Sequence, residues 1–165
     1  IDSRNPYEIP GEILVKGQNV MLGYYKNKEA TAETLANGWY HTGDLGIMDR
    51  HGNSFIKGRI KNMLLSSNGQ NMYPEEIEDK LNNLPYVQEC VVVQREDKLY
   101  GLVYPDPELI KKTNISPALL SEKMEDNRKI LNKQLPLYEQ LAGIIVCDQE
   151  FEKTPKRSIK RFMYS

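Results

Sequence analysis

The segment from residue 39 to residue 46, WYHTGDLG, holds the residues of the first third of the chain that are best suited to chemistry. An aromatic pair leads into a glycine turn, and Asp44 is expected to face outward from it. A carboxylate has acceptor oxygens and no donor, so Asp44 could bind the two hydroxyls of a diol such as ribose. The alternative is that Thr42 and Asp44 only satisfy the backbone of their own turn. Taken by itself, the segment favours this alternative.

Two cations, Arg59 and Lys61, follow after a short interval and are separated by one residue. Residues 60–66 have the composition of a strand. Alternate residues of a strand share a face, so Arg59 and Lys61 could serve one site. A guanidinium is well shaped for phosphate or ribose oxygens. An exposed basic edge that discourages strand aggregation explains the same pair equally well.

The composition is that of an ordinary globular protein. With 165 residues, 39% of them hydrophobic and 27% charged, the chain can form one domain, or a small domain with a piece of a neighbour. A net charge of −1 argues against a general polyanion binder. No run approaches the roughly 20 apolar residues that span a bilayer. The absence of an initiator methionine and of a signal-peptide pattern indicates a chain excised from a longer protein.

Both cysteines lie in apolar runs. Cys90 precedes three valines and Cys147 ends the run that begins at residue 141, so both thiols are predicted to be small buried hydrophobes. Neither a disulfide framework nor a metal pair is indicated. A reducing, cytoplasmic location fits this pattern best.

The first third is predicted to form strands and hairpins around one short helix. Turns are expected at residues 37–38 and 51–53, and residues 27–35 have helical character. A boundary is placed at residues 58–61, because strands without long helices precede it and a β-α-β-like alternation follows. No internal repeat or low-complexity segment is present.

The second part is predicted to combine a small sheet with helices. Gly69 marks a turn, and Pro74 begins a helix whose acidic first turn suits the helix dipole. Strands are expected at residues 90–93, 99–104 and 141–147. A longer helix is expected from about Ser116 to Leu135, with residues 126–128 exposed and a buried stripe formed by Leu120, Met124, Leu131 and Leu135. The fold class that follows is α+β.

Four segments, in order, resemble motifs of the adenylate-forming superfamily, which includes acyl-CoA synthetases, luciferases and peptide-synthetase adenylation domains. Residues 11–25 resemble its G-E-[IL]-x-x-x-G segment ending in G-Y, and residues 39–44 its W-x-x-T-G-D motif. Residues 58–61 resemble its G-R-x-[DK] hinge motif, and residues 69–78 its G-x-x-[IV]-x-P-x-E-[IL]-E segment. Any one match could arise by chance, whereas four in the right order and spacing are strong evidence.

The resemblance implies roles for individual residues. Asp44 would bind the ribose hydroxyls of ATP and of the acyl-adenylate, and Arg59 would support the same nucleotide. Lys61 would occupy the hinge about which the C-terminal domain rotates. Gly69 would lie where the backbone passes close to the pantetheine arm of coenzyme A, which a residue without a Cβ permits. A tight turn before the helix explains Gly69 as well.

The tail departs from the family pattern P-x-T-x-x-G-K, or T-x-x-x-K in the long-chain branch. When Thr154 is aligned with the threonine of that pattern, Arg157 stands in place of glycine and Ser158 in place of the catalytic lysine. The resemblance therefore implies that either Lys160 or Lys156 supplies the missing charge, or adenylation in this enzyme is slower or differently assisted. In an extended strand both would share a face with Ser158. Lys160 is slightly favoured, because Lys160-Arg161 keeps the basic ending of the family. A solvated basic tail is the structural alternative.

The resemblance further implies an organisation and a reaction. Residues 1–58 would end a large N-terminal adenylation domain, and residues 59–165 would form the mobile C-terminal domain. The enzyme would use ATP, coenzyme A and a fatty acid, first forming acyl-AMP and then the thioester. Lys61 and the Y-P-E-E-I-E stretch favour the long-chain fatty acid branch. Mg²⁺ is implied, with its ligands outside this chain, so this piece alone is expected to be inactive.

A non-catalytic binding module is the rival hypothesis. Its basic tail would contact nucleic acid or an anionic membrane through five residues: Lys153, Lys156, Arg157, Lys160 and Arg161. Because the basic charge is confined to one end, no nucleic-acid partner is predicted. The predicted partners are the substrates and the N-terminal domain of the same enzyme. A peripheral membrane association is a further option.

Overall fold

The computed structural model describes residues 1–164 and divides them into two compact units, one ending at Met63 and the other starting at Leu64. Each unit contains both strands and helices, which confirms the α+β fold class. The division lies a few residues beyond the predicted boundary, after the short turn that follows Arg59. That the first unit ends a larger adenylation domain stays a prediction.

The first unit is built around one long central strand, β3 (Trp39–Met48). Three strands pair with it in antiparallel fashion: β1 (Gly11–Val15), β2 (Leu35–Ala36) and β4 (Ser54–Arg59). Helix α1 (Lys28–Thr34) precedes β2 and is capped by the Asn27 side chain. The two predicted turns are confirmed. Asn37 and Gly38 join β2 to β3 with positive φ at both positions, and the turn around Gly52 joins β3 to β4.

The prediction of one strand over residues 60–66 is wrong. Residues Ile60–Asn62 form a single 3₁₀ turn, η1, because the Met63 N–H donates to the carbonyls of Arg59 and Ile60 instead of joining a ladder. A two-residue strand, β5 (Leu64–Leu65), then pairs with β6 (Asn71–Met72). Strand alternation therefore cannot place the side chains of Arg59 and Lys61 on one face.

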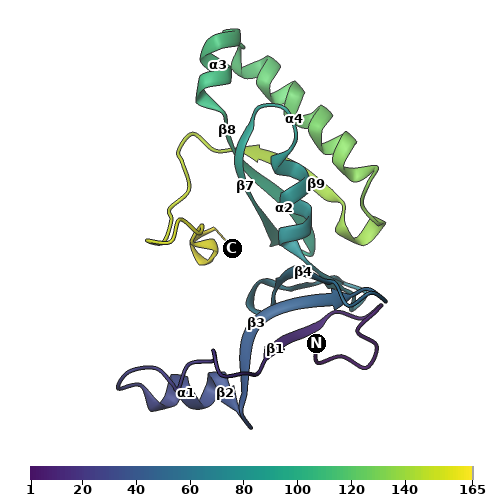
Figure 1. Ribbon diagram of the computed structural model, residues 1–165. Coiled ribbons are helices and arrows are strands. Elements are labelled where there is room, and N and C mark those ends of the chain that lie inside the picture. The colour runs from purple at the N-terminus through teal and green to yellow at the C-terminus, as the bar shows by residue number, and fades with distance from the viewer. Residues whose placement is uncertain (165) are drawn as a thin grey trace. The chain divides into compact units, whose positions relative to one another are not determined.

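The second unit contains a three-stranded sheet in the order β7-β8-β9 (Figure 1). Strands β7 (Val87–Arg95) and β8 (Lys98–Pro105) form an antiparallel hairpin, and β9 (Leu141–Val146) runs parallel to β8. The crossover between β8 and β9 contains α3 (Pro107–Thr113), α4 (Pro117–Asn132) and the 3₁₀ turn η2 (Leu137–Glu139). The three predicted strands and the β-α-β alternation are thus confirmed.

Each face of this sheet has its own covering. Helices α2 (Pro74–Asn82) and α4 cover one face, where Ile77, Leu81, Met124 and Leu131 pack against alternate residues of the strands. All four residues of the predicted stripe are buried, but α4 ends at Asn132, so Leu135 lies beyond the helix and the predicted end at Leu135 is wrong. The opposite face holds Val91, Val93 and Leu102, and it is covered by Phe151 and other residues of the C-terminal tail. Period-two alternation along β7 divides the valines between these two cores.

One predicted surface residue of α4 is buried. Asn127 is only 3% exposed, and its amide donates to the Pro85 carbonyl at 2.8 Å. The prediction that residues 126–128 are exposed is therefore wrong at Asn127. Its position explains this, because it lies three residues after Met124 and four before Leu131, on the same face of the helix.

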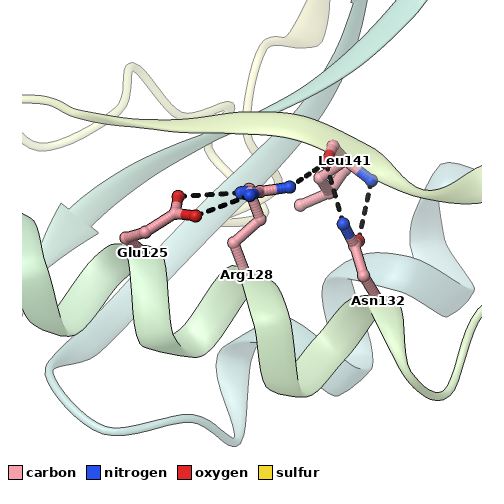
Figure 2. A network of polar contacts seen from close by, with 4 residues as sticks. All are labelled: Glu125, Arg128, Asn132 and Leu141. Atoms are coloured by element: carbon pink, nitrogen blue, oxygen red, sulfur yellow. Dashed lines mark hydrogen bonds and ion pairs between the residues drawn. The ribbon is translucent and has the colours of Figure 1, made fainter.

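Helix α4 is tied to the first residue of β9 by a polar network (Figure 2). The Asn132 amide donates to the Leu141 carbonyl and accepts from the Leu141 N–H, both at 2.9 Å. Arg128 donates to the same carbonyl at 3.1 Å and forms a bidentate ion pair with Glu125. These bonds set the register at which β9 enters the sheet.

The two cysteines are unpaired with each other and lie at different depths. Cys90 is buried, and burial raises the pKa of its thiol well above the ordinary value, whereas Cys147 is half-buried. Among the described residues, no helix has the length and apolar character needed to cross a membrane.

Candidate functional site

A network of hydrogen bonds fixes the turn that precedes Asp44. Glu12 on β1 accepts the Gly43 N–H at 2.9 Å through one carboxylate oxygen, and its other oxygen lies 2.8 Å from Nδ1 of His41. The Thr42 hydroxyl donates to the Ile13 carbonyl at 2.7 Å and accepts the Asp44 N–H at 3.0 Å. Thr42 thus satisfies the backbone of its own turn, as the structural alternative supposed, and in doing so it fixes the backbone at Asp44.

The structure brings Asp44 and Arg59 together. They are direct cross-strand partners on β3 and β4, and Nε of Arg59 donates to Oδ1 of Asp44 at 2.7 Å. Both side chains remain partly exposed. An ionised carboxylate has about four acceptor positions, so this ion pair leaves capacity for the two hydroxyls of a diol. The guanidinium beside it can bind an anionic group of the same ligand.

Lys61 and Gly69 occupy short turns. Lys61 is exposed within η1, in the predicted hinge segment. Gly69 has a φ of +79°, its N–H donates to the Ser66 carbonyl at 2.9 Å, and no atom lies within 4 Å of the position that a Cβ would take. The open space on that side is compatible with a close ligand approach, and the left-handed φ accounts for the glycine by itself. Their roles as hinge and pantetheine contact stay predictions.

A shallow hollow of about 380 Å³ adjoins the turn before Gly69. Its lining comes from three segments of the second unit: the turn at residues 66–68, the hairpin end at 97–99 and four residues between 137 and 142, from η2 to the start of β9. Leu137 of this lining is 87% exposed. The hollow thus lies beside the predicted pantetheine contact.

The tail folds into a hairpin that presents Ser158 to solvent. The Thr154 N–H donates to the Ser158 carbonyl and the Lys160 N–H to the Glu152 carbonyl, both at 2.8 Å. Between these bonds Lys153 pairs with Ile159, which packs against the core of the sheet. Ser158 and Lys160 therefore face away from that core, because neighbouring residues of an extended strand point to opposite sides.

The two predicted catalytic lysines lie in different parts of the hairpin. Lys160 shares the outward face with Ser158, and its ammonium is 3.6 Å from a carboxylate oxygen of Glu152. Lys156 lies in the turn between the two arms, so the extended-strand argument does not apply to it. Arg157 closes that turn with a φ of +63°, a left-handed conformation that explains why glycine is usual there.

The residues that sequence reasoning missed are Glu78 and its partner Arg161. Glu78 is only 8% exposed, accepts the Val92 N–H at 2.5 Å and forms an ion pair with the Arg161 guanidinium. Burial raises the pKa of Glu78 to about 7, although the positive charge of Arg161 acts in the opposite direction. Glu78 is the last residue of the P-x-E-[IL]-E segment, and this position in a motif was the sequence feature that could have indicated a role for it.

The raised pKa of Glu78 predicts a pH-dependent stability. Between its ordinary value of 4.5 and about 7, the folded chain holds this proton more tightly than the unfolded chain does. The free energy of unfolding should therefore decrease as pH rises through this window, by on the order of 3 kcal/mol from this group. Urea unfolding at pH 5, 6, 7 and 8 measures the trend. Glu78→Gln should remove this part of the slope, and an unchanged slope would contradict the assignment.

No group of three or more metal-ligating side chains is found among residues 1–164. The Mg²⁺ ligands that the resemblance implies were predicted to lie outside this chain, and this stays a prediction.

Comparison with known sequences gives one family and several relatives. Residues 61–164 match the family described as the AMP-binding enzyme C-terminal domain. A 2-succinylbenzoate–CoA ligase of Bacillus cytotoxicus is 44% identical over 98 residues, which is 59% of this chain and 20% of that protein. A feruloyl-CoA synthase of an Amycolatopsis species is 44% identical over 93 residues, 56% of this chain and 19% of that protein. The match thus spans about a fifth of the length of these curated relatives.

Solved structures share the fold over almost the whole chain. The adenylation domain of a carboxylate reductase from Mycobacterium chelonae superposes with a TM-score of 0.82 at 26% identity, covering 93% of this chain and 26% of that one. O-succinylbenzoate coenzyme A synthetase from Bacillus subtilis, in complex with AMP, gives a TM-score of 0.73 at 26% identity. It covers 96% of this chain and 30% of the synthetase chain.

Proposed function

Because the chain belongs to the AMP-binding enzyme C-terminal domain family, we propose that it is the C-terminal part of a ligase that joins a carboxylic acid to coenzyme A. The acid is first activated with ATP as an acyl-adenylate, and the thiol of coenzyme A then displaces AMP. A larger N-terminal domain of the same enzyme supplies the remainder of the site and the ligands for Mg²⁺, which screens phosphate charge when bound.

The pairing of Asp44 with Arg59 is the observation that carries this proposal. A carboxylate next to a guanidinium, on two strands with a fixed turn behind them, offers acceptors for ribose hydroxyls and a donor for phosphate or ribose oxygens. The surrounding bonds from Glu12 and Thr42 hold the turn before substrate arrives. Such preorganisation is the main contribution that a protein makes to adenylate transfer.

The substrate of the proposed ligase is assigned here only to the class of carboxylic acids. The two relatives described above are named for 2-succinylbenzoate and feruloyl substrates. Lys61 and the Y-P-E-E-I-E stretch suggested a long-chain fatty acid, but neither relative supports that narrower assignment. An aryl or aryl-bearing acid is therefore proposed first, and a peripheral membrane association is not needed for it.

The binding-module hypothesis is weakened by the tail itself. Lys153 pairs with Glu89 and Glu150, Lys160 lies near Glu152, and Arg161 pairs with Glu78. Three of the five basic residues thus face carboxylates of the same unit, which reduces the charge available to a polyanion.

The function is tested by comparing this chain with the longer enzyme proposed to contain it. With ATP, Mg²⁺ and a panel of aryl and fatty acids, the longer enzyme should release pyrophosphate and, with coenzyme A, form thioester. The 165-residue chain alone should release none. Pyrophosphate release by the chain alone, or a longer enzyme that activates no acid of the panel, would contradict the proposal. The identity of the accepted acid decides between the aryl and fatty-acid alternatives.

A further inference from the structure

The free edge of β7 is closed by two side chains from opposite layers of the second unit. Strand β7 is an end strand of the sheet, so one side of its backbone has no strand partner. At Val92, the N–H donates to Glu78 at 2.5 Å, and the carbonyl accepts from Nη1 of Arg161 at 3.4 Å. Glu78 comes from α2, which covers one face, and Arg161 comes from the tail, whose apolar residues cover the other face.

These two side chains also form an ion pair with each other. The pair is shielded from solvent, since the side chain of Glu78 is 11% exposed and that of Arg161 is 22% exposed. A buried ion pair contributes little net stability compared with apolar residues, although removing one partner is costly. The ion pair also fixes the direction from which the Arg161 side chain reaches the sheet edge.

The ion pair attaches the tail to the sheet close to Ser158 and Lys160. Arg161 follows Lys160 directly and lies three residues after Ser158, at the start of the 3₁₀ turn η3 (Arg161–Met163). On the other side of the hairpin, Phe151 is buried and its N–H donates to Glu89 at 3.1 Å. The hairpin is therefore held at both ends, by an apolar anchor before it and by the ion pair after it.

We propose that Glu78 and Arg161 form a positioning clamp, which holds the tail hairpin so that Ser158 and Lys160 are presented for the adenylation half-reaction. This inference rests on the proposed function. Neither clamp residue is proposed to touch substrate. Without the clamp the outgoing arm keeps its contacts at Ile159 and Tyr164, so a small displacement of Lys160 is expected, and displacements of about 1 Å can cost on the order of 100-fold in rate.

The first test measures docking of the tail in the 165-residue chain and does not depend on enzymatic activity. Hydrogen exchange of residues 150–164 is compared at pH 8, where Glu78 with its pKa of about 7 is ionised, between wild type, Arg161→Met, Arg161→Lys and Glu78→Gln. Exchange should be at least tenfold faster in Arg161→Met and in Glu78→Gln, and Arg161→Lys should recover part of the protection. Arg95→Met, an exposed cation on the same strand β7, is the matched control and should behave as wild type.

The second test measures both half-reactions in the longer enzyme. Arg161→Met should lower the kcat of pyrophosphate exchange 10- to 100-fold, with the KM for ATP changed less than twofold. Thioester formation from supplied acyl-adenylate should stay within threefold of wild type, and Arg161→Lys should restore adenylation at least fivefold over Arg161→Met. Glu78→Gln preserves side-chain shape and repeats the test should Arg161→Met fold poorly.

The two experiments distinguish failure of the clamp hypothesis from failure of the proposed function. Unchanged tail exchange in both Arg161→Met and Glu78→Gln would overturn the clamp, whatever the activity. An equal loss in both half-reactions would also overturn it, because that result indicates a general structural role. If the wild-type longer enzyme activates no acid, the proposed function fails, while the exchange experiment still decides whether the clamp orders the tail.

Discussion

Lys160→Ala in the longer enzyme is expected to slow acyl-adenylate formation on the order of 100-fold, the usual cost of losing one charged donor at a developing negative charge. Ser158 is a neutral hydroxyl at the position where the resemblance expects a lysine, and we propose that a neighbour supplies the charge. Lys160 lies on the same outward face of the hairpin. Pyrophosphate exchange measures the adenylation step, and thioester formation from supplied acyl-adenylate should change less than threefold.

Lys156→Ala is the matched control, since it removes the same charge from the turn of the same hairpin. A larger loss of adenylation in Lys156→Ala than in Lys160→Ala would reassign the role to Lys156. A double variant, Ser158→Lys with Lys160→Ala, should recover at least tenfold over Lys160→Ala alone, because it restores an ammonium two residues away on the same face. If neither single variant slows adenylation more than thioester formation, the substitution hypothesis is wrong.

Asp44→Ala should impair both half-reactions, in contrast to the tail variants. The carboxylate is proposed to bind the ribose of ATP in the first step and of the acyl-adenylate in the second. Two charge-assisted hydrogen bonds of about 1.5–3 kcal/mol each would be lost, which corresponds to a decrease of 100-fold or more in kcat/KM for ATP. Steady-state kinetics with ATP, and with acyl-adenylate as the starting substrate, measure the two effects.

Asp49→Ala is the control for Asp44→Ala, because Asp49 lies in the adjacent turn of the same unit. Its carboxylate accepts from the His51 N–H and from the backbone and side chain of Asn53, and the Asn53 side-chain bond is the largest cause that lowers its pKa. Asp49→Ala should loosen the β3–β4 turn and leave the KM for ATP within twofold. Equal losses in the two variants would mean that Asp44 acts only through the fold of the hairpin.

Local patterns of the sequence were sufficient to predict most helices and strands of the second unit. The valine run of β7, the alternation of β8 and the helical spacing of Leu120, Met124 and Leu131 each specify an element and its buried face. The segment after Arg59 was mispredicted, because its apolar content suits a strand while its backbone closes a single turn. Composition does not determine which hydrogen bonds a short segment makes.

The site could be predicted only where its residues belong to recognisable motifs. Asp44 and Arg59 each stood in such a motif, but their contact depends on the register of β3 against β4, which shifts between Leu45 and Gly46. Glu78 and Arg161 are 83 residues apart. Glu78 was read as one of several acids favouring the start of a helix, and its burial becomes visible only once α2 and the tail meet at β7.

The parallel pairing of β8 with β9 has a consequence for the order in which the second unit folds. The β7–β8 hairpin turns at Glu96 and Asp97, both with positive φ, and such local hairpins form in about 1–10 μs. Strand β9 can join only after α3 and α4 have crossed over, a longer loop closure with a larger entropic cost. The tail needs β7 and α2 in place for Arg161 to dock. A newly synthesised chain is therefore expected to complete its sheet before it acquires an adenylation-competent tail.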